Sequence, residues 1–167
     1  QDYTAALLES GTVSAAVTSQ ARPVPGCAAR PLGAMRYVAV AAPPFVAAWL
    51  ADGTSASAFA RTPLVDFDRR DDLQGRYLAV IGADPRTPPR HHVPASNDFA
   101  TAVLLGMGWA LLPEQQAAGP LADGRLVRLG GPPIDVPLYW QRWKLDSPLL
   151  ARIEDTIVAA ARVDLRH

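Results

Sequence analysis

The sequence predicts an α/β fold with mostly parallel sheets. Short apolar runs of strand length alternate along the chain with stretches of helical character, and this alternation is typical of parallel sheets joined by right-handed crossovers. The run Tyr37–Val40 is apolar without a break, as in a strand that is buried on both faces. A last, amphipathic helix follows Ser147. In such sheets, ligands bind beyond the carboxyl ends of the strands.

Glycine and proline mark the expected element boundaries in the first part of the chain. Gly11 ends a first helix. Pro43-Pro44 ends a strand and begins a helix, and Pro63 follows a further short helix. The elements expected up to residue 67 are a helix over 3–10, strands over 12–18 and 35–42 on either side of a Pro/Gly loop at 22–26, helices over 45–50 and 55–61, and a strand over 64–67.

Acidic and hydroxyl side chains mark the helix starts in the rest of the chain. Asp71 and Asp72 favour the positive end of a helix dipole. Ser96 and Ser147 are placed as N-caps, the latter with Pro148 at the first helical position. The elements expected here are a helix over 71–81, a loop over 82–89, a strand over 91–93, a helix over 96–106, a strand over 109–112, a helix over 113–118, strands over 125–129 and 136–143, and the helix that begins at 148.

Composition excludes several function classes. Hydrophobic residues make up 49% of the 167 residues and charged residues 19%, so we expect a folded domain and not a disordered tail. The 16 basic and 16 acidic residues cancel, so the chain has no positive field for DNA. A single cysteine, Cys27, allows no internal disulfide and fits a cytoplasmic location. No apolar run is long enough to span a membrane, and Gln1–Thr4 does not begin a signal peptide.

Two segments resemble those of LysR-type effector-binding domains. Gly106–Pro113 is similar to the G-x-G-(apolar)-A-L-L-P segment of that family, and Leu7–Val17 resembles its L-x-x-G-x-(L/V)-D-x-A-I passage from helix to strand, with Ser14 where Asp is frequent. Three further segments resemble one branch, the lysine- and arginine-responsive regulators that control basic amino acid export. These segments are Pro31–Tyr37, Phe67–Leu73 and Leu138–Trp143.

The resemblance implies a two-lobed, periplasmic-binding-protein-like (type 2) fold with two crossover strands and the effector in the cleft between the lobes. Lobe one would comprise residues 1–42 and 138–167, and lobe two residues 43–137. The family's winged helix-turn-helix, and the N-terminal strand and helix of lobe one, are expected to be absent from this chain. The full-length regulator would then be a homodimer or tetramer that binds DNA through that absent domain and does not bind membranes.

A basic amino acid needs hydrogen-bond donors for its carboxylate and carboxylates for its cations. The donors that we place at the site are the hydroxyls of Thr18 and Ser19, the helix start at Ser96 and Asn97, and the side chain of Gln141. The alternatives are an ordinary N-cap for Ser96 and core packing for the strand that contains Gln141.

Asp66 and Asp68 are the predicted carboxylates, with Asp66 preferred because it lies nearest the strand. They could instead belong to a solvated loop in which Arg69 and Arg70 neutralise them. The predicted protein has no catalytic residue, no metal site and no cofactor. The alternative functions are a solute-binding receptor of the same fold and a small metal-dependent hydrolase that uses the acidic cluster at 66–72. His91-His92 lacks a third ligand at a recognisable spacing.

Overall fold

The computed structural model describes residues 2–167, and the chain divides into two compact units. Unit 1 comprises Gln1–Arg36 and Asp135–His167, and unit 2 comprises Tyr37–Ile134. Two long strands, β2 (Cys27–Ala41) and β7 (Ile134–Trp143), contribute residues to both units. They belong to a five-stranded sheet with the order β1-β7-β2-β5, in which β6 also pairs with β2. Strands β3 and β4 form a separate two-stranded sheet.

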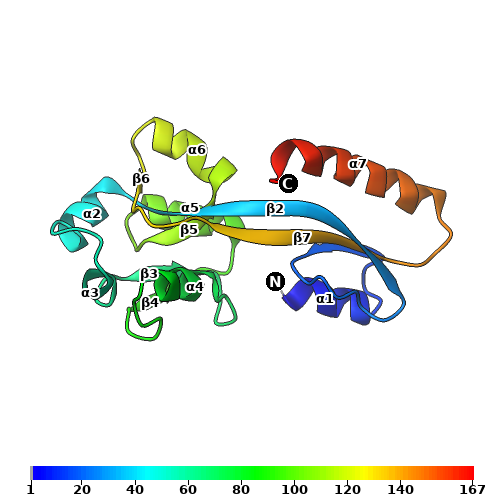
Figure 1. The fold of residues 1–167 in the computed structure, drawn as a ribbon, viewed down its shortest axis with the longest axis horizontal. Helices are drawn as coiled ribbons and strands as arrows, with labels where there is room; N and C mark the ends of the chain where they lie inside the picture. The colour runs from blue at the N-terminus through cyan, green and yellow to red at the C-terminus, as the bar shows by residue number, and fades with distance from the viewer. Residues whose placement is uncertain (1) are drawn as a thin grey trace. The chain divides into compact units, whose positions relative to one another are not determined.

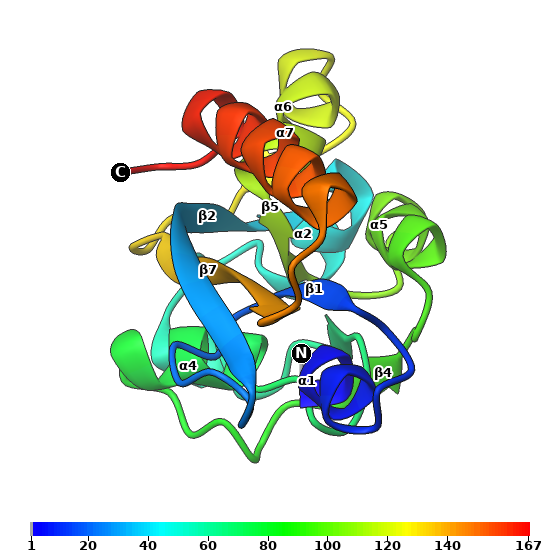
Figure 2. The ribbon, with the colours of Figure 1, turned by 90° about the vertical axis from the view of Figure 1, so that its right-hand side faces the viewer.

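Unit 1 has a helix on each side of its strands. Its other elements are α1 (Asp2–Glu9), β1 (Ala15–Thr18) and α7 (Pro148–Asp164). Figures 1 and 2 both show α7 above the strands and α1 below them. Successive side chains of a strand point to opposite faces of the sheet, which explains the two layers. Trp140 packs on the face that α7 covers, and the next residue, Gln141, points to the opposite face. Cys27, the first residue of β2, is buried in a cluster with Ala5 and Leu8 of α1, and burial raises the pKa of its thiol.

The predicted start of α7 is confirmed. The Ser147 hydroxyl accepts a hydrogen bond from the Leu150 N–H at 3.3 Å, and Pro148 occupies the first turn. The helix packs on Leu32 and Trp140 through Ala161 and its neighbours. The predicted apolar face comprised Leu149, Leu150, Ile153, Ile157, Ala160 and Ala161, but Leu149 and Ile153 are 66% and 38% exposed. Of that predicted face, Ile157 and Ala161 pack in this cluster, whereas Ala160 is exposed as well.

Unit 2 surrounds its strands with short helices. Its elements are α2 (Pro43–Trp49), α3 (Ala56–Phe59), β3 (Leu64–Asp66), α4 (Leu73–Val80), β4 (Arg90–His92), α5 (Ser96–Leu104), β5 (Ala110–Pro113), α6 (Glu114–Ala122) and β6 (Val127–Arg128). One core cluster joins Val38 and Val40 of β2 to Val103 of α5 and Leu112 of β5. No helix in the described part of the chain is long and apolar enough to cross a membrane.

Three buried aromatic rings form a second cluster in unit 2. The ring centroids of Phe59 and Trp109 are 5.0 Å apart, those of Tyr77 and Trp109 5.5 Å, and those of Phe59 and Tyr77 5.9 Å. The Tyr77 hydroxyl donates to the Gly130 carbonyl at 2.8 Å, which ties the cluster to the loop before β7. Gly131 has φ +71°, and a Cβ there would lie 2.5 Å from the Tyr77 hydroxyl. The loop therefore requires glycine at this position.

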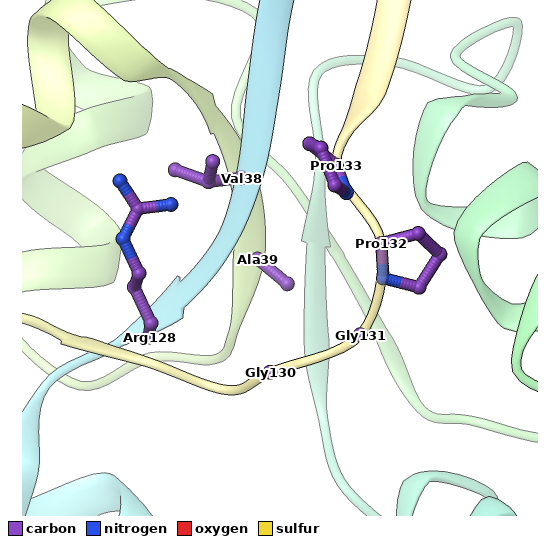
Figure 3. Close-up of a pocket in the computed structure, with 7 residues that line it drawn as sticks. All are labelled: Val38, Ala39, Arg128, Gly130, Gly131, Pro132 and Pro133. Carbon is purple, nitrogen blue, oxygen red and sulfur yellow. The ribbon is translucent and has the colours of Figure 1, made fainter.

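The same loop borders a shallow pocket (Figure 3). Its lining residues are Val38, Ala39, Arg128, Gly130, Gly131, Pro132 and Pro133. The Arg128 guanidinium donates to Glu114 at 3.1 Å, so the one charge at the pocket is already paired.

The prediction of mostly parallel sheets is wrong for the larger sheet. β1 pairs antiparallel with β7, and β2 pairs antiparallel with both β5 and β6. The β3–β4 pair is parallel, as expected. The alternation of apolar patterns in the sequence predicts where strands and helices form, but not how distant strands pair. β1 and β7 are neighbours in the sheet although they come from opposite ends of the chain. Their relative direction therefore follows from the tertiary fold and not from a local crossover.

The strand predicted over 35–42 begins eight residues earlier, at Cys27. Pro31 and Gly33 lie in this earlier part of the strand, although both residue types weaken strands. The structure accommodates Gly33 at φ +124°. The next residue pairs with the chain end: the Ala34 N–H donates to the Arg166 carbonyl at 2.8 Å, and the Ala34 carbonyl accepts the Arg166 N–H at 2.9 Å. This single bridge comes from a segment more than a hundred residues away and adds to the pairing that β2 makes with its sheet neighbours.

Replacing Gly108 by alanine tests the packing of unit 2. The new Cβ would lie 3.0 Å from the Pro63 carbonyl oxygen and 3.0 Å from Val65 Cγ2, and a backbone oxygen cannot move aside easily. We expect the free energy of unfolding in urea to fall by about 1–3 kcal/mol. Gly75→Ala is the matched control, because Gly75 lies in α4 and a Cβ there would meet only Pro85 Cβ, at an ordinary van der Waals distance of 3.6 Å. The control should gain up to about 1 kcal/mol, and equal effects of the two changes would contradict the packing described.

Candidate functional site

Unit 2 brings four of the seven predicted site residues to one edge. β3 and β4 are parallel, so their carboxyl ends lie together (Figure 1). Asp66 ends β3 and Asp68 follows it, while α5 begins with Ser96 and Asn97 shortly after β4. The Val93 N–H donates to the Asp66 carbonyl at 3.0 Å and joins the two segments. We call residues 66–71 and 93–97 the β3–β4 edge.

Asp66 is buried and already has one cationic partner. Its side chain is 2% exposed, and its Oδ2 accepts a bond from Arg90 Nη1 at 2.5 Å. The other guanidinium nitrogen of Arg90 donates to the Pro85 carbonyl. Burial raises the pKa of Asp66, although the bond from Arg90 and its charge act in the opposite direction. Asp66 Oδ1 has no partner, so one buried acceptor is left over at this position.

Asp68 and Asp71 shape the turn that follows β3. Asp68 Oδ1 accepts the N–H groups of Arg70 at 2.7 Å and of Asp71 at 3.1 Å. The Asp71 carboxylate accepts the N–H groups of Phe67 at 3.0 Å and Leu73 at 3.1 Å. The prediction of a helix that starts at Asp71 is therefore wrong, because α4 begins at Leu73 and Asp71 belongs to the preceding turn. Sequence reasoning missed this role, although Asp side chains commonly bond to the backbone two residues onward.

The N-cap prediction for Ser96 is wrong by one residue. Ala95 occupies the cap position, because its carbonyl accepts the Phe99 N–H at 2.8 Å and closes the first turn. Ser96 and Asn97 are the first helical residues, and both are exposed. The side chain of Ala95 offers no capping bond, so the first N–H groups of α5 have no side-chain partner from the cap. Such groups favour an anion.

The other three predicted residues lie in unit 1, where two of them hold a loop. Gln141 is fully buried; its Oε1 accepts the Val24 N–H at 3.1 Å, and its Nε2 donates to the Gln20 carbonyl at 2.8 Å. The Thr18 hydroxyl accepts the Gln20 N–H at 3.2 Å. Ser19 is half-buried where this loop begins. These contacts fit the packing interpretation of Gln141, and an effector contact by these three residues stays a prediction.

Histidines contribute little to this edge. His91 and His92 are both exposed at the end of β4. Across residues 2–167, no group of three or more His, Cys, Asp or Glu side chains could hold a metal ion.

Comparison with known sequences connects this chain to transcription regulators. The family model "LysR substrate binding domain" matches residues 2–162. The chain is 48% identical over 161 residues to the HTH-type transcriptional regulator LysG of Mycobacterium tuberculosis, covering 96% of this chain and 53% of the relative. It is 42% identical over 165 residues to the lysine export transcriptional regulatory protein LysG of Corynebacterium glutamicum. That match covers 98% of this chain and 56% of the relative. The chain thus spans about half the length of the curated relatives that it matches, and those relatives are regulators, not enzymes.

Solved structures give the same result for the fold. ArgP from Mycobacterium tuberculosis superposes with a TM-score of 0.93 at 48% identity, over 99% of this chain and 57% of that one. Full-length LysG from Corynebacterium glutamicum with the bound effector Arg superposes with a TM-score of 0.81 at 40% identity. The match covers 99% of this chain and 56% of that one. These likenesses confirm the predicted class, an α/β fold of the periplasmic-binding-protein-like type 2.

Arg90→Met tests the buried ion pair. The change leaves the Asp66 carboxylate buried without its partner, and we expect the free energy of unfolding to fall by about 2 kcal/mol at pH 7. The pKa of Asp66 is already raised by burial and would rise further. A folded-state pKa above the unfolded value of about 3.9 makes the loss smaller at pH 5 than at pH 8.

The matched control for that experiment is Arg86→Met. Arg86 pairs with Asp84 at 3.0 Å, but its side chain is largely exposed, so its removal should change stability by less than about 1 kcal/mol. Urea unfolding of both variants at the two pH values measures the difference. A loss for Arg90→Met that is no greater than the control's would mean that the buried pair does not stabilise unit 2.

Gln141→Ala separates packing from effector binding in unit 1. The change removes the bonds to the loop at 20–24 and leaves the buried Val24 N–H unpaired, so we expect a loss of about 2 kcal/mol in urea unfolding. Gln116→Ala, an exposed glutamine of α6, should have almost no effect. If Gln141→Ala instead unfolds like the unaltered chain, the loop contacts carry little energy and the binding interpretation gains support.

Proposed function

The chain belongs to the LysR substrate-binding domain family, and on that premise we propose that it is the effector-sensing part of a transcription regulator that responds to a basic amino acid. The observation that carries the proposal is its 40% identity and TM-score of 0.81 to a LysG structure whose bound effector is Arg. The effector would be L-arginine or L-lysine, and the regulated gene a basic amino acid exporter. The protein would be a binding module and not an enzyme.

The β3–β4 edge has the chemistry that an amino acid needs. The first turn of α5 offers N–H groups for a carboxylate. Asp68 uses Oδ1 for the turn, which leaves its second carboxylate oxygen for an ammonium or guanidinium group. Asp66 Oδ1 is a further acceptor, although it is buried. Opposite charges of the effector thus have complementary groups within one edge of unit 2.

Regulation requires that the effector bind one conformation more tightly than another. A ligand that shifts a two-state balance from about 1:99 to 99:1 must prefer one state by roughly 10⁴-fold, or about 5.5 kcal/mol. A few charge-assisted hydrogen bonds, at about 1.5–3 kcal/mol each, provide that difference if they form in one state only. This requirement favours charged contacts like those at the β3–β4 edge.

The remaining functions belong to the full-length protein. We propose that DNA is bound by a winged helix-turn-helix outside this chain, which the zero net charge of the chain supports. A homodimer or tetramer is the expected assembly, and the exposed Leu149 and Ile153 of α7 provide an apolar face for it. A protein that acts on chromosomal DNA works in the cytoplasm.

Calorimetric titration of the full-length protein with L-arginine, L-lysine and L-citrulline tests the proposal. Citrulline has nearly the shape of arginine without its charge, so we expect saturable binding of the two basic amino acids only. Asp68→Asn should weaken both by about tenfold or more, because Asn can still accept the turn bonds but lacks the negative charge. Asp52→Asn, an exposed aspartate of the same unit, is the control. Asp66→Asn is less informative, since it also leaves Arg90 without its partner.

Two results would count against the proposal in different ways. Equal binding of citrulline and arginine would exclude charge recognition. Binding of none of the three would leave the family membership intact and remove basic amino acids as effectors.

A further inference from the structure

One aromatic ring at the β3–β4 edge is exposed although its neighbours in the strand are buried. Leu64, Val65 and Asp66 of β3 are all buried, whereas the next residue, Phe67, is 37% exposed. Its one ring contact is with Phe99, at a centroid distance of 6.3 Å and an interplanar angle of 48°. A phenyl ring left partly in water would gain burial energy from a ligand that covers it.

The backbone on both sides of Phe67 is fixed. Its own N–H donates to the Asp71 carboxylate at 3.0 Å, and the carbonyl of the preceding Asp66 accepts the Val93 N–H at 3.0 Å. The Asp71 carboxylate also accepts bonds from Leu73 N–H and Gln74 Nε2, so it is held in place itself. The ring is therefore presented by a rigid turn and not by a flexible loop.

The surroundings of the ring suit a cation with an apolar stem. Phe99, on which the ring leans, lies in the first turn of α5, where the uncapped N–H groups are found. Asp66 and Asp68 flank Phe67 in the chain, and each has a carboxylate oxygen that the turn does not use. A ring face attracts cations and also packs against methylene groups. Both features occur together in the side chains of arginine and lysine.

Building on the proposed function, we propose that the Phe67 ring is the surface on which the effector's side chain stacks, and that it favours arginine over lysine. A planar guanidinium stacks on an aromatic face and is weakly hydrated, whereas an ammonium is a compact, strongly hydrated charge. The α-carboxylate then lies at the start of α5, and the side chain extends across the ring. Phe67 is thus a specificity-determining residue.

Titration of the full-length protein and its Phe67→Leu variant with both amino acids tests this role. Leucine keeps an apolar side chain but has no ring face, so we expect arginine binding to weaken about fivefold and lysine binding by less than twofold. Phe67→Tyr keeps the ring and should bind both within twofold of the unaltered protein. Trp49→Leu is the control for loss of an exposed aromatic elsewhere in unit 2 and should change neither.

The possible results separate this inference from the proposed function. If the unaltered protein binds arginine and lysine but Phe67→Leu binds both as tightly, the stacking role is wrong and the proposed function stands. The same conclusion follows if Phe67→Tyr loses arginine binding as Phe67→Leu does. If the unaltered protein binds neither amino acid, both the proposed function and the role of Phe67 are overturned. A selective loss of arginine binding in Phe67→Leu, with Phe67→Tyr unaffected, supports the inference.

Discussion

The structure depends on one strand, β2, whose 15 residues extend through both units and have hydrogen-bonded partners in each. In unit 2, its last residues pair with β5 at one edge and β6 at the other, while Val38 and Val40 enter the core. In unit 1, Leu32 packs beneath α7 and Ala34 pairs with Arg166. A strand with both edges and both faces in use has little freedom to change register, because a shift of one residue would reverse every side chain. The elements of each unit are positioned against this fixed reference.

Local signals in the sequence located the helix starts to within two residues, whereas strand direction and strand length depended on distant partners and were predicted less well. Ser147 and Pro148 predicted the start of α7 correctly because cap and helix lie within four residues of each other. The start of β2 at Cys27 was missed, because the partners of its first half lie far away in the sequence, as the pairing of Ala34 with Arg166 shows. The antiparallel arrangement of β1 and β7 could not be read from either strand alone. The fold class was predicted nevertheless, because the resemblance to a family describes the whole chain and not single elements.

The candidate site followed the same division. The sequence placed polar residues at the ends of β3 and β4, and the structure brings Asp66, Asp68, Ser96 and Asn97 to one edge. Which groups remain free depended on tertiary contacts: Arg90 occupies one oxygen of Asp66, and Gln141 is committed to a loop in unit 1. The carboxylates of Asp68 and Asp71 at this edge accept backbone N–H groups and so stabilise the turn after β3. The few unused acceptors therefore restrict which ligand charges the edge can take, so rigidity and selectivity have a common origin.

The burial of Cys27 has a practical value for fluorescence and paramagnetic labelling. It is the only thiol of these 167 residues, and it is packed against α1 with a raised pKa, so little reactive thiolate forms near neutral pH. A cysteine introduced on the exposed surface would therefore react with maleimide or nitroxide reagents far faster than the native one. Site-specific probes could thus be attached to the folded chain with little labelling of Cys27, and Cys27 would not have to be substituted first.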